Sequence, residues 1–231
     1  MSSNTSQLPY FFKVSSLCQF DFCSKRSKIE LFKQYAPFKP NMKGKKPMAV
    51  GNRLHYLFSY PLRSFDRVYL RAKLGNNRTF QKQVDNIVVR GRYDDLRVIT
   101  VDGKKYTILL EIKTTSKKYI ATFEIRAAMR QLQLYMWLMK EDLEKLGFPL
   151  WKSGCLEYYS QRNGELLKRV SVPYCDNIEE WIRYVVDCFR GLRSVRPPDK
   201  KICKFCPRRV KAVCPWYKAR MRKTKHGYGN N

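Results

Sequence analysis

Histidine is the scarcest candidate metal ligand in this sequence. Only His55 and His226 occur among the 231 residues, and His226 lies in the basic C-terminal tail. Any histidine ligand to a metal is therefore predicted to be His55. An isolated histidine on an apolar helix is more often a hydrogen-bonded core residue than a ligand, so both interpretations stay open at this point.

Long apolar runs are also missing. No stretch approaches the ~18 apolar residues of a membrane-spanning helix, and Met1 to Gln7 lacks the charged start of a secretion signal. We therefore expect a soluble, cytoplasmic protein without a membrane partner, inside the host cell if the source is viral. The phosphate loop G-x-x-x-x-G-K-S/T is absent too, which excludes an ATP motor of that type from this chain.

Acidic residues are few relative to basic ones. The 19 Asp and Glu stand against 47 Lys and Arg, which gives a formal net charge of +28. An excess of this size predicts a polyanionic partner, and we expect nucleic acid because no basic helix with a bulky apolar face suggests a membrane surface. With 44% hydrophobic and 14% aromatic residues, the chain can still build a substantial core.

Cysteine is present but too sparse for a disulfide scaffold. The eight cysteines are unevenly spread, and three of them, Cys203, Cys206 and Cys214, cluster late in the chain. The C-x-x-C spacing of the first two allows two thiolates to bind one metal centre. A fourth ligand would come from Cys23 or Cys18 if the two ends of the chain meet, and the centre would be a zinc ion or an iron–sulfur cluster.

The order of elements predicts an α/β protein. We expect helices that begin near Ser15, Met48, Lys117 and Asn177, strand material at 67–74, 80–90 and 108–115, and a hairpin at 154–172 with an Asn163-Gly164 turn. Four regions are predicted. They are an N-terminal helix and basic loop (1–47), a core (48–196), a cysteine segment (197–216) and a fraying, disordered basic tail (217–231).

The stretch from Ile108 to Thr115 carries the clearest chemical pattern. Side chains alternate along a strand, so Glu111 and Lys113 share one face. Asp94 precedes this strand in a hairpin that turns at Asp102-Gly103, although Asp95 is an equally acidic neighbour. Two carboxylates beside a lysine suit a divalent-metal-dependent enzyme that cuts phosphodiester bonds, because carboxylates bind hard cations and an ammonium group attracts phosphate. An acid and a lysine two residues apart on a strand are, taken alone, more often a surface ion pair.

The motifs together form a recognisable series. In chain order they are Cys23, Gly51-x-x-x-His55, Gly91-x-x-Asp94, Glu111-x-Lys113, Gln131-x-x-x-Tyr135, and the late cysteines Cys203, Cys206 and Cys214. This series resembles the RecB-like PD-(D/E)xK nucleases, and most closely the CRISPR-associated exonucleases that hold an iron–sulfur cluster. The resemblance spans the chain from about Cys23 to Cys214.

The resemblance implies a fold and a role for each matching residue. The fold would be a restriction-endonuclease-like core with a mixed central sheet flanked by helices, plus an iron–sulfur subdomain formed by the N- and C-terminal segments. His55, Asp94, Glu111 and the carbonyl of Ile112 would bind Mg²⁺ or Mn²⁺, while Lys113 would act on the attacking water and the phosphate. Gln131 and Tyr135 would support the site. Cys23, Cys203, Cys206 and Cys214 would hold a [4Fe–4S] cluster, with zinc as the alternative.

The expected function is a metal-dependent DNA exonuclease that trims single-stranded ends, with 5′ to 3′ polarity and possible endonuclease activity. The resemblance suggests CRISPR spacer acquisition, with integrase proteins or a helicase as partners, although a virus or mobile element could carry the same enzyme. A homo-oligomer is a further expectation. The alternative is a non-catalytic nucleic-acid-binding module with a structural metal. That alternative leaves His55, Asp94, Glu111 and Lys113 without a use.

Overall fold

The structure is a computed structural model that describes residues 10–21, 23–25, 28, 64–75, 78–117, 119–194, 203 and 206–219. Several predictions therefore lie outside the described residues. These are the basic loop at 39–47, the helix predicted from Met48 that carries His55, and the tail beyond residue 219.

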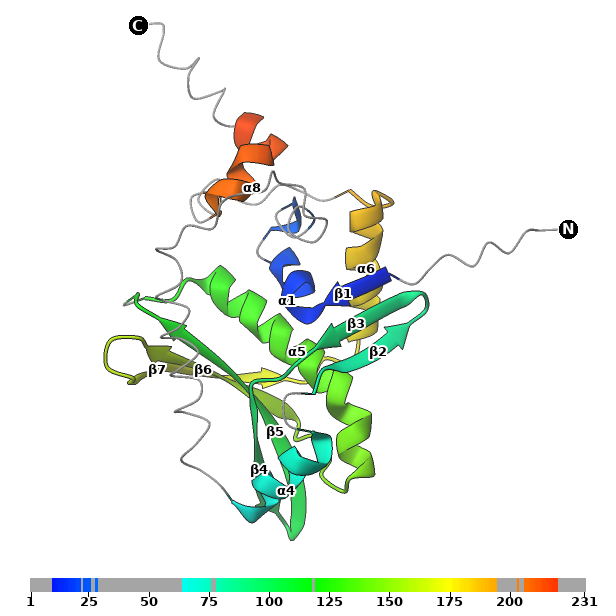
Figure 1. The fold of residues 1–231 in the computed structure, drawn as a ribbon, viewed down its shortest axis with the longest axis vertical. Coiled ribbons are helices and arrows are strands. Elements are labelled where there is room, and N and C mark those ends of the chain that lie inside the picture. Colours follow the sequence, from blue (N-terminus) through cyan, green and yellow to red (C-terminus); the bar gives the residue numbers. More distant parts are fainter. Residues whose placement is uncertain are drawn as a thin grey trace, which may run out of the picture.

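A four-stranded mixed sheet forms one layer of the molecule (Figure 1). Its order is β4 (Asp95–Val101), β5 (Lys104–Thr115), β6 (Ser153–Ser160) and β7 (Leu166–Pro173). β5 pairs antiparallel with β4 and parallel with β6, which in turn pairs antiparallel with β7. Asp102 and Gly103 both have positive φ, 49° and 73°, as a tight two-residue hairpin turn requires. The mixed sheet and both predicted hairpins are confirmed.

A second, three-stranded sheet has the order β1 (Tyr10–Lys13), β3 (Ile87–Gly91) and β2 (Phe80–Val84). The segment 80–90 was expected as strand material, and a turn at Asp85 and Asn86 divides it into the antiparallel pair β2 and β3. β1 pairs parallel with β3, and its Phe12 is 3% exposed in the main core. The N-terminal residues thus pack with the core elements.

The long helix α5 (Thr122–Lys145) lies between the two sheets (Figure 1). Its six consecutive residues from Leu134 to Met139 are all buried, so no face of this stretch is turned to solvent. A helix that is apolar on every side belongs in the centre of a domain. The helix was predicted from Lys117, but it begins at Thr122, where the Glu124 carboxylate accepts a hydrogen bond from the Ala121 N–H at 3.2 Å.

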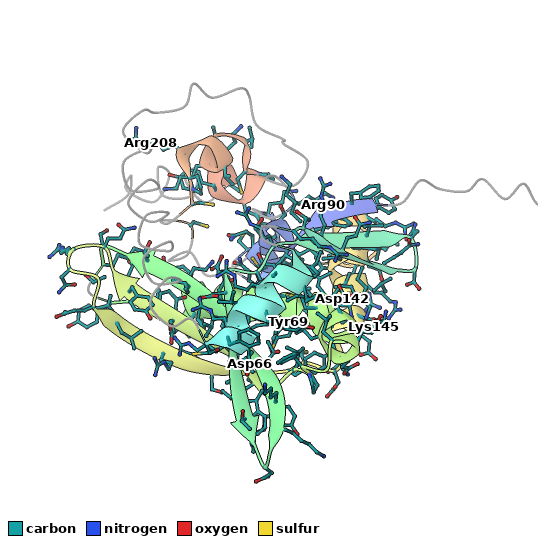
Figure 2. The ribbon with its side chains drawn as sticks, turned by 60° about the horizontal axis from the view of Figure 1, so that its bottom comes forward. Asp66, Tyr69, Arg90, Asp142, Lys145 and Arg208 are labelled. Carbon is teal, nitrogen blue, oxygen red and sulfur yellow. The ribbon has the colours of Figure 1, made fainter. Side chains whose placement is uncertain are left out.

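Residues 65–74 form a helix, α4 (Phe65–Leu74), so the prediction of a strand at 67–74 is wrong. The Ser64 hydroxyl accepts the Arg67 N–H at 3.3 Å and caps the first turn, while Gly75 ends the helix with φ 83°. Arg67, Leu70 and Leu74 are buried at the three- and four-residue spacing of a helix. Helix α4 packs against β4, and Asp66 in its first turn accepts a hydrogen bond of 2.8 Å from Lys105 of β5 (Figure 2).

The remaining elements lie around this arrangement. The N-terminal strand leads into α1 (Val14–Leu17) and the short 3-10 helix η1 (Cys18–Phe20). Helix α6 (Ile178–Arg190) begins directly after Asn177, near which a helix was predicted, and ends at Gly191. Helix α8 (Arg208–Val213) has its own small hydrophobic cluster, separate from the main core. Within the described residues, no helix is both long enough and apolar enough to cross a membrane.

Candidate active site

Glu111 and Lys113 lie together on the face of β5 that is turned toward α5. Glu111 is fully buried, and the Lys113 ammonium group donates a short hydrogen bond to Glu111 Oε1. The same ammonium group donates a second hydrogen bond, of 3.1 Å, to Gln131 Oε1 on α5. The acid, the base and the amide are therefore held by an inner strand and the central helix of the fold.

The structure places Asp94 beside this pair and Asp95 away from it. Asp94 Oδ2 accepts the backbone N–H of Ile112 at 3.0 Å, which fixes it across the strand from Glu111. Asp95 is 2% exposed and faces α4, where it forms ion pairs with Arg67 and, at 3.3 Å, with Arg71. Of the two neighbouring acids, only Asp94 is directed to the Glu111 site.

Burial and charge shift the proton affinities of the site. Burial raises the pKa of Glu111 to about 8, with a further rise from the negative charge of Asp94, and the Lys113 ammonium group opposes both. Burial lowers the pKa of Lys113, but the carboxylates of Glu111 and Asp94 outweigh this and leave it above its ordinary value. Lys113 consequently carries a proton, and a positive charge, at neutral pH.

Tyr135 extends this network to the second sheet. Gln131 Nε2 donates a hydrogen bond of 3.1 Å to the Tyr135 hydroxyl one turn further along α5. The Tyr135 ring packs against Gly91, where a Cβ atom would lie only 2.6 Å from ring carbon Cε1 and 2.7 Å from Val14 Cγ2. Gly91 is therefore required for the close approach of this ring, which gives the Gly91-x-x-Asp94 pattern a physical reason.

A cleft of ≈ 560 Å³ opens next to Lys113, and we call it the Lys113 cleft. One side is formed by the end of β5 and the residues after it, and the other by the first turns of α5. Cys18 and Gln19 of η1 and Tyr158 of β6 complete the lining. Its residues are Cys18, Gln19, Lys113, Thr114, Thr115, Lys117, Ile120, Glu124, Ala127, Ala128, Gln131 and Tyr158.

The predicted divalent cation fits the acidic end of this arrangement. Glu111 Oε2 is buried and has no hydrogen-bond partner among the residues that the structure describes. A buried carboxylate oxygen without a partner is costly unless something compensates it, and a hard cation bound by carboxylate oxygens would do so. Glu111, Asp94 and the Ile112 carbonyl would hold this ion, and His55, the fourth predicted ligand, lies outside the described residues.

The structure gives no support to the predicted cysteine centre within the described residues. The described residues include Cys23, Cys203, Cys206 and Cys214, yet they contain no group of three or more His, Cys, Asp or Glu side chains that could hold a metal. Cys206 and Cys214 share the small cluster of α8 around Val210. Neither a [4Fe–4S] cluster nor a zinc ion is therefore supported. The alternative ligand Cys18 lies in the Lys113 cleft, with its Sγ 3.9 Å from Gln131 Oε1.

Comparison with known proteins identifies the family. A family model of the PD-(D/E)XK nuclease superfamily matches residues 29–215, which is most of the chain. The chain belongs to this superfamily. Glu111-Ile112-Lys113 has the residue types of the (D/E)XK part of the superfamily's name, and Asp94 is an acid that precedes it in the chain.

Solved structures show the same fold for this PD-(D/E)XK protein. Seventeen chains match, among them the one titled "Crystal structure of SSO0001", with a TM-score of 0.51 and 19% identity. That match covers 92% of this chain and 89% of the other. At this identity the likeness concerns the fold alone. A search of curated proteins finds no match.

Two residues that line the Lys113 cleft were not predicted as neighbours of Lys113. Cys18 was considered only as the alternative to Cys23 in the cysteine centre. Tyr158 of the predicted hairpin is 5% exposed and stands opposite Lys113 in the β5–β6 register. The sequence did not show that β6 pairs parallel with β5, and this pairing places Tyr158 beside Lys113.

Proposed function

We propose that this PD-(D/E)XK protein is a divalent-metal-dependent DNA nuclease that hydrolyses phosphodiester bonds. The single observation that carries the proposal is the buried Glu111 Oε2, which lacks a partner among the described residues next to the Lys113 ammonium group and Asp94. In the buried ion pair of Asp95, by contrast, both carboxylate oxygens have partners. An oxygen kept available inside the protein is better explained as a ligand position.

Each residue of the site has a role in this proposal. Glu111, Asp94 and the Ile112 carbonyl would hold Mg²⁺ or Mn²⁺, which would polarise the phosphate and acidify a bound water. Lys113 keeps its proton and places a positive charge where negative charge grows on the phosphate. Gln131 accepts a hydrogen bond from this ammonium group and donates one to Tyr135, so it fixes the direction of the lysine.

The proposal also covers the DNA substrate, the polarity of cleavage and the cellular role. Single-stranded DNA ends are the expected substrate, and exonuclease action with 5′ to 3′ polarity is expected from the resemblance to the CRISPR-associated family. A role in spacer acquisition, with integrase proteins or a helicase as partners, rests on the same resemblance, as does a role in viral DNA processing. The high positive charge supports a nucleic acid substrate.

The test measures cleavage of end-labelled single- and double-stranded oligonucleotides with Mg²⁺, with Mn²⁺ and with EDTA. We expect metal-dependent cutting by the wild type and a loss of at least about 100-fold in Lys113→Ala and Glu111→Gln. Lys104→Ala, an exposed lysine on the same strand, and Glu165→Gln, an exposed acid, are the matched controls and should cut normally. A wild-type protein that binds DNA without cutting it would instead favour the non-catalytic binding module.

A further inference from the structure

The two ends of the Lys113 cleft differ in charge. One end carries the Lys113 ammonium group beside the carboxylates of the proposed metal site. At the other end the Lys117 ammonium group and the Glu124 carboxylate form an ion pair, so their charges cancel. A phosphate is attracted to the first end, whereas the second end suits an uncharged group with polar edges.

The residues that line the cleft between these two ends have small or apolar side chains. Ala127 and Ala128 of α5 are 8% and 4% exposed, and with Ile120 and Tyr158 they line the cleft. A nucleobase has two apolar faces and a polar edge, and it packs on apolar and aromatic side chains whatever its identity. A volume of ≈ 560 Å³ is in the range of pockets that hold one small organic ligand.

The far end of the cleft is held in place before any ligand binds. Glu124 Oε2 accepts the Ala121 N–H at 3.2 Å, and the backbone carbonyl of Glu124 accepts the Tyr158 hydroxyl at 3.3 Å. The Thr115 hydroxyl accepts the Lys117 N–H at 3.1 Å. These bonds fix the polar groups of the ion-paired end relative to Lys113, and a fixed polar site loses little conformational entropy on binding.

We propose that the Lys113 cleft binds the unpaired base of the nucleotide next to the scissile phosphate. The phosphate lies at Lys113, the base packs on Ala127 and Tyr158, and its edge faces the Lys117–Glu124 ion pair. A base that is still paired cannot enter a cleft of this size together with its partner, so the cleft selects single strands and frayed ends. This inference rests on the proposed nuclease function and adds a base-binding subsite to it.

Ala127 is the residue that tests the subsite most directly. It lines the cleft but lies outside the hydrophobic cluster that α5 forms with the two sheets. Replacing it with leucine fills the space of the base without removing a charge or a hydrogen bond. Ala72→Leu, the same change at an exposed position of α4, is the matched control.

The experiment uses single-stranded oligonucleotides with one cleavable phosphodiester and nuclease-resistant linkages elsewhere. An intact substrate is compared with two others that lack the base on the 5′ or the 3′ side of that bond. We expect the wild type to lose at least about tenfold in kcat/KM on one abasic substrate. On the intact substrate, Ala127→Leu should have a kcat/KM lower than that of the wild type by a similar factor. On that abasic substrate the two proteins should have nearly equal kcat/KM values, because the leucine side chain and the base would occupy the same space.

Two results would overturn the inference. One is a wild type that cuts all three substrates equally well, and the other is an Ala127→Leu loss that is undiminished on the abasic substrates. If circular dichroism shows that Ala127→Leu does not fold, Lys117→Ala is used in its place. This variant should have a raised KM on the intact substrate and an unchanged KM on the abasic substrate. Absence of cutting on the intact substrate by the wild type, with either metal, would refute the nuclease function itself and the subsite with it.

Discussion

Glu111 is fully buried, and its pKa of about 8 lies above the ordinary value of 4.5. Between these two values the folded, metal-free protein keeps a proton that the unfolded chain releases. The free energy of unfolding is therefore expected to fall as pH rises through this window, by at most about 1.4 kcal/mol per pH unit. Urea unfolding in EDTA from about pH 5 to about pH 8 measures this slope.

Glu111→Gln should remove that slope, since an amide does not titrate in this range. Glu165→Gln, at an exposed position, should leave it unchanged. Mg²⁺ or Mn²⁺ should raise the melting temperature of the wild type more near pH 8 than near pH 5, because protons and metal compete for the same oxygens. Equal slopes in the wild type and Glu111→Gln would show that the Glu111 proton is not held by folding.

Gly91 is expected to tolerate no side chain. In Gly91→Ala the new Cβ would meet the Tyr135 ring at 2.6 Å and Val14 at 2.7 Å, so the ring must move. We expect a loss of about 1–3 kcal/mol in the free energy of unfolding, together with reduced cleavage, because Tyr135 supports Gln131 and through it Lys113. Tyr135→Phe keeps the ring and should reduce cleavage with a smaller loss of stability. A fully stable, fully active Gly91→Ala would show that the ring is not held against this position.

Helix α4 is joined to strand β4 by a buried ion pair next to Asp94, one of the proposed metal ligands. Arg67 and Asp95 are 3% and 2% exposed, and Asp95 also accepts the Leu96 N–H at 2.8 Å. Asp95→Leu leaves the Arg67 charge without its carboxylate and should cost about 3–5 kcal/mol of stability. The double variant Arg67→Met with Asp95→Leu removes both charges and should recover most of this loss. A double variant no more stable than the single one would contradict this account.

The elements that the sequence predicted well carry their signals locally. The β6–β7 hairpin has Asn163-Gly164 at its turn, with Gly164 at φ 75°, and α6 has an apolar face that ends at Gly191. Helix α4 was missed because its segment alternates apolar and basic residues and so imitates a strand. The correct signals were the Ser64 cap, the Gly75 stop and the spacing of Leu70 and Leu74.

The site itself was only partly visible from the sequence. Strand alternation placed Glu111 with Lys113, and the turn at Asp102-Gly103 brought the segment before β4 alongside them. The choice between Asp94 and Asp95 depended on α4, which attracts Asp95 through Arg67. The positions of Cys18 and Tyr158 depend on contacts between segments that are far apart in the sequence. A local sequence pattern does not show which strands pair with each other.

The positive charge of the whole molecule has a consequence that no single contact shows. The formal net charge is +28, yet the buried acids near the site are already paired with cations from the same chain. The 47 Lys and Arg exceed the 19 Asp and Glu by 28, and under the proposed function this excess of positive charge would attract the phosphates along the path of a strand that extends beyond the Lys113 cleft. Helix α8 carries the basic residues Arg208 and Lys211. Arg208 is exposed on α8, which packs its own small cluster apart from the main core (Figure 2).

The salt dependence of DNA binding tests whether α8 belongs to that path. In EDTA, which prevents cutting, binding of a single-stranded oligonucleotide should weaken linearly as log[salt] rises. Arg208→Ala should reduce the magnitude of this slope by about 0.7 if its charge neutralises one phosphate. Arg183→Ala on α6 is the control, because Arg183 already pairs with Asp85 at 2.7 Å, and its slope should equal that of the wild type. An unchanged slope in Arg208→Ala would place α8 outside the DNA path, and the strand would then be bound by the sheet, α5 and the cleft between them.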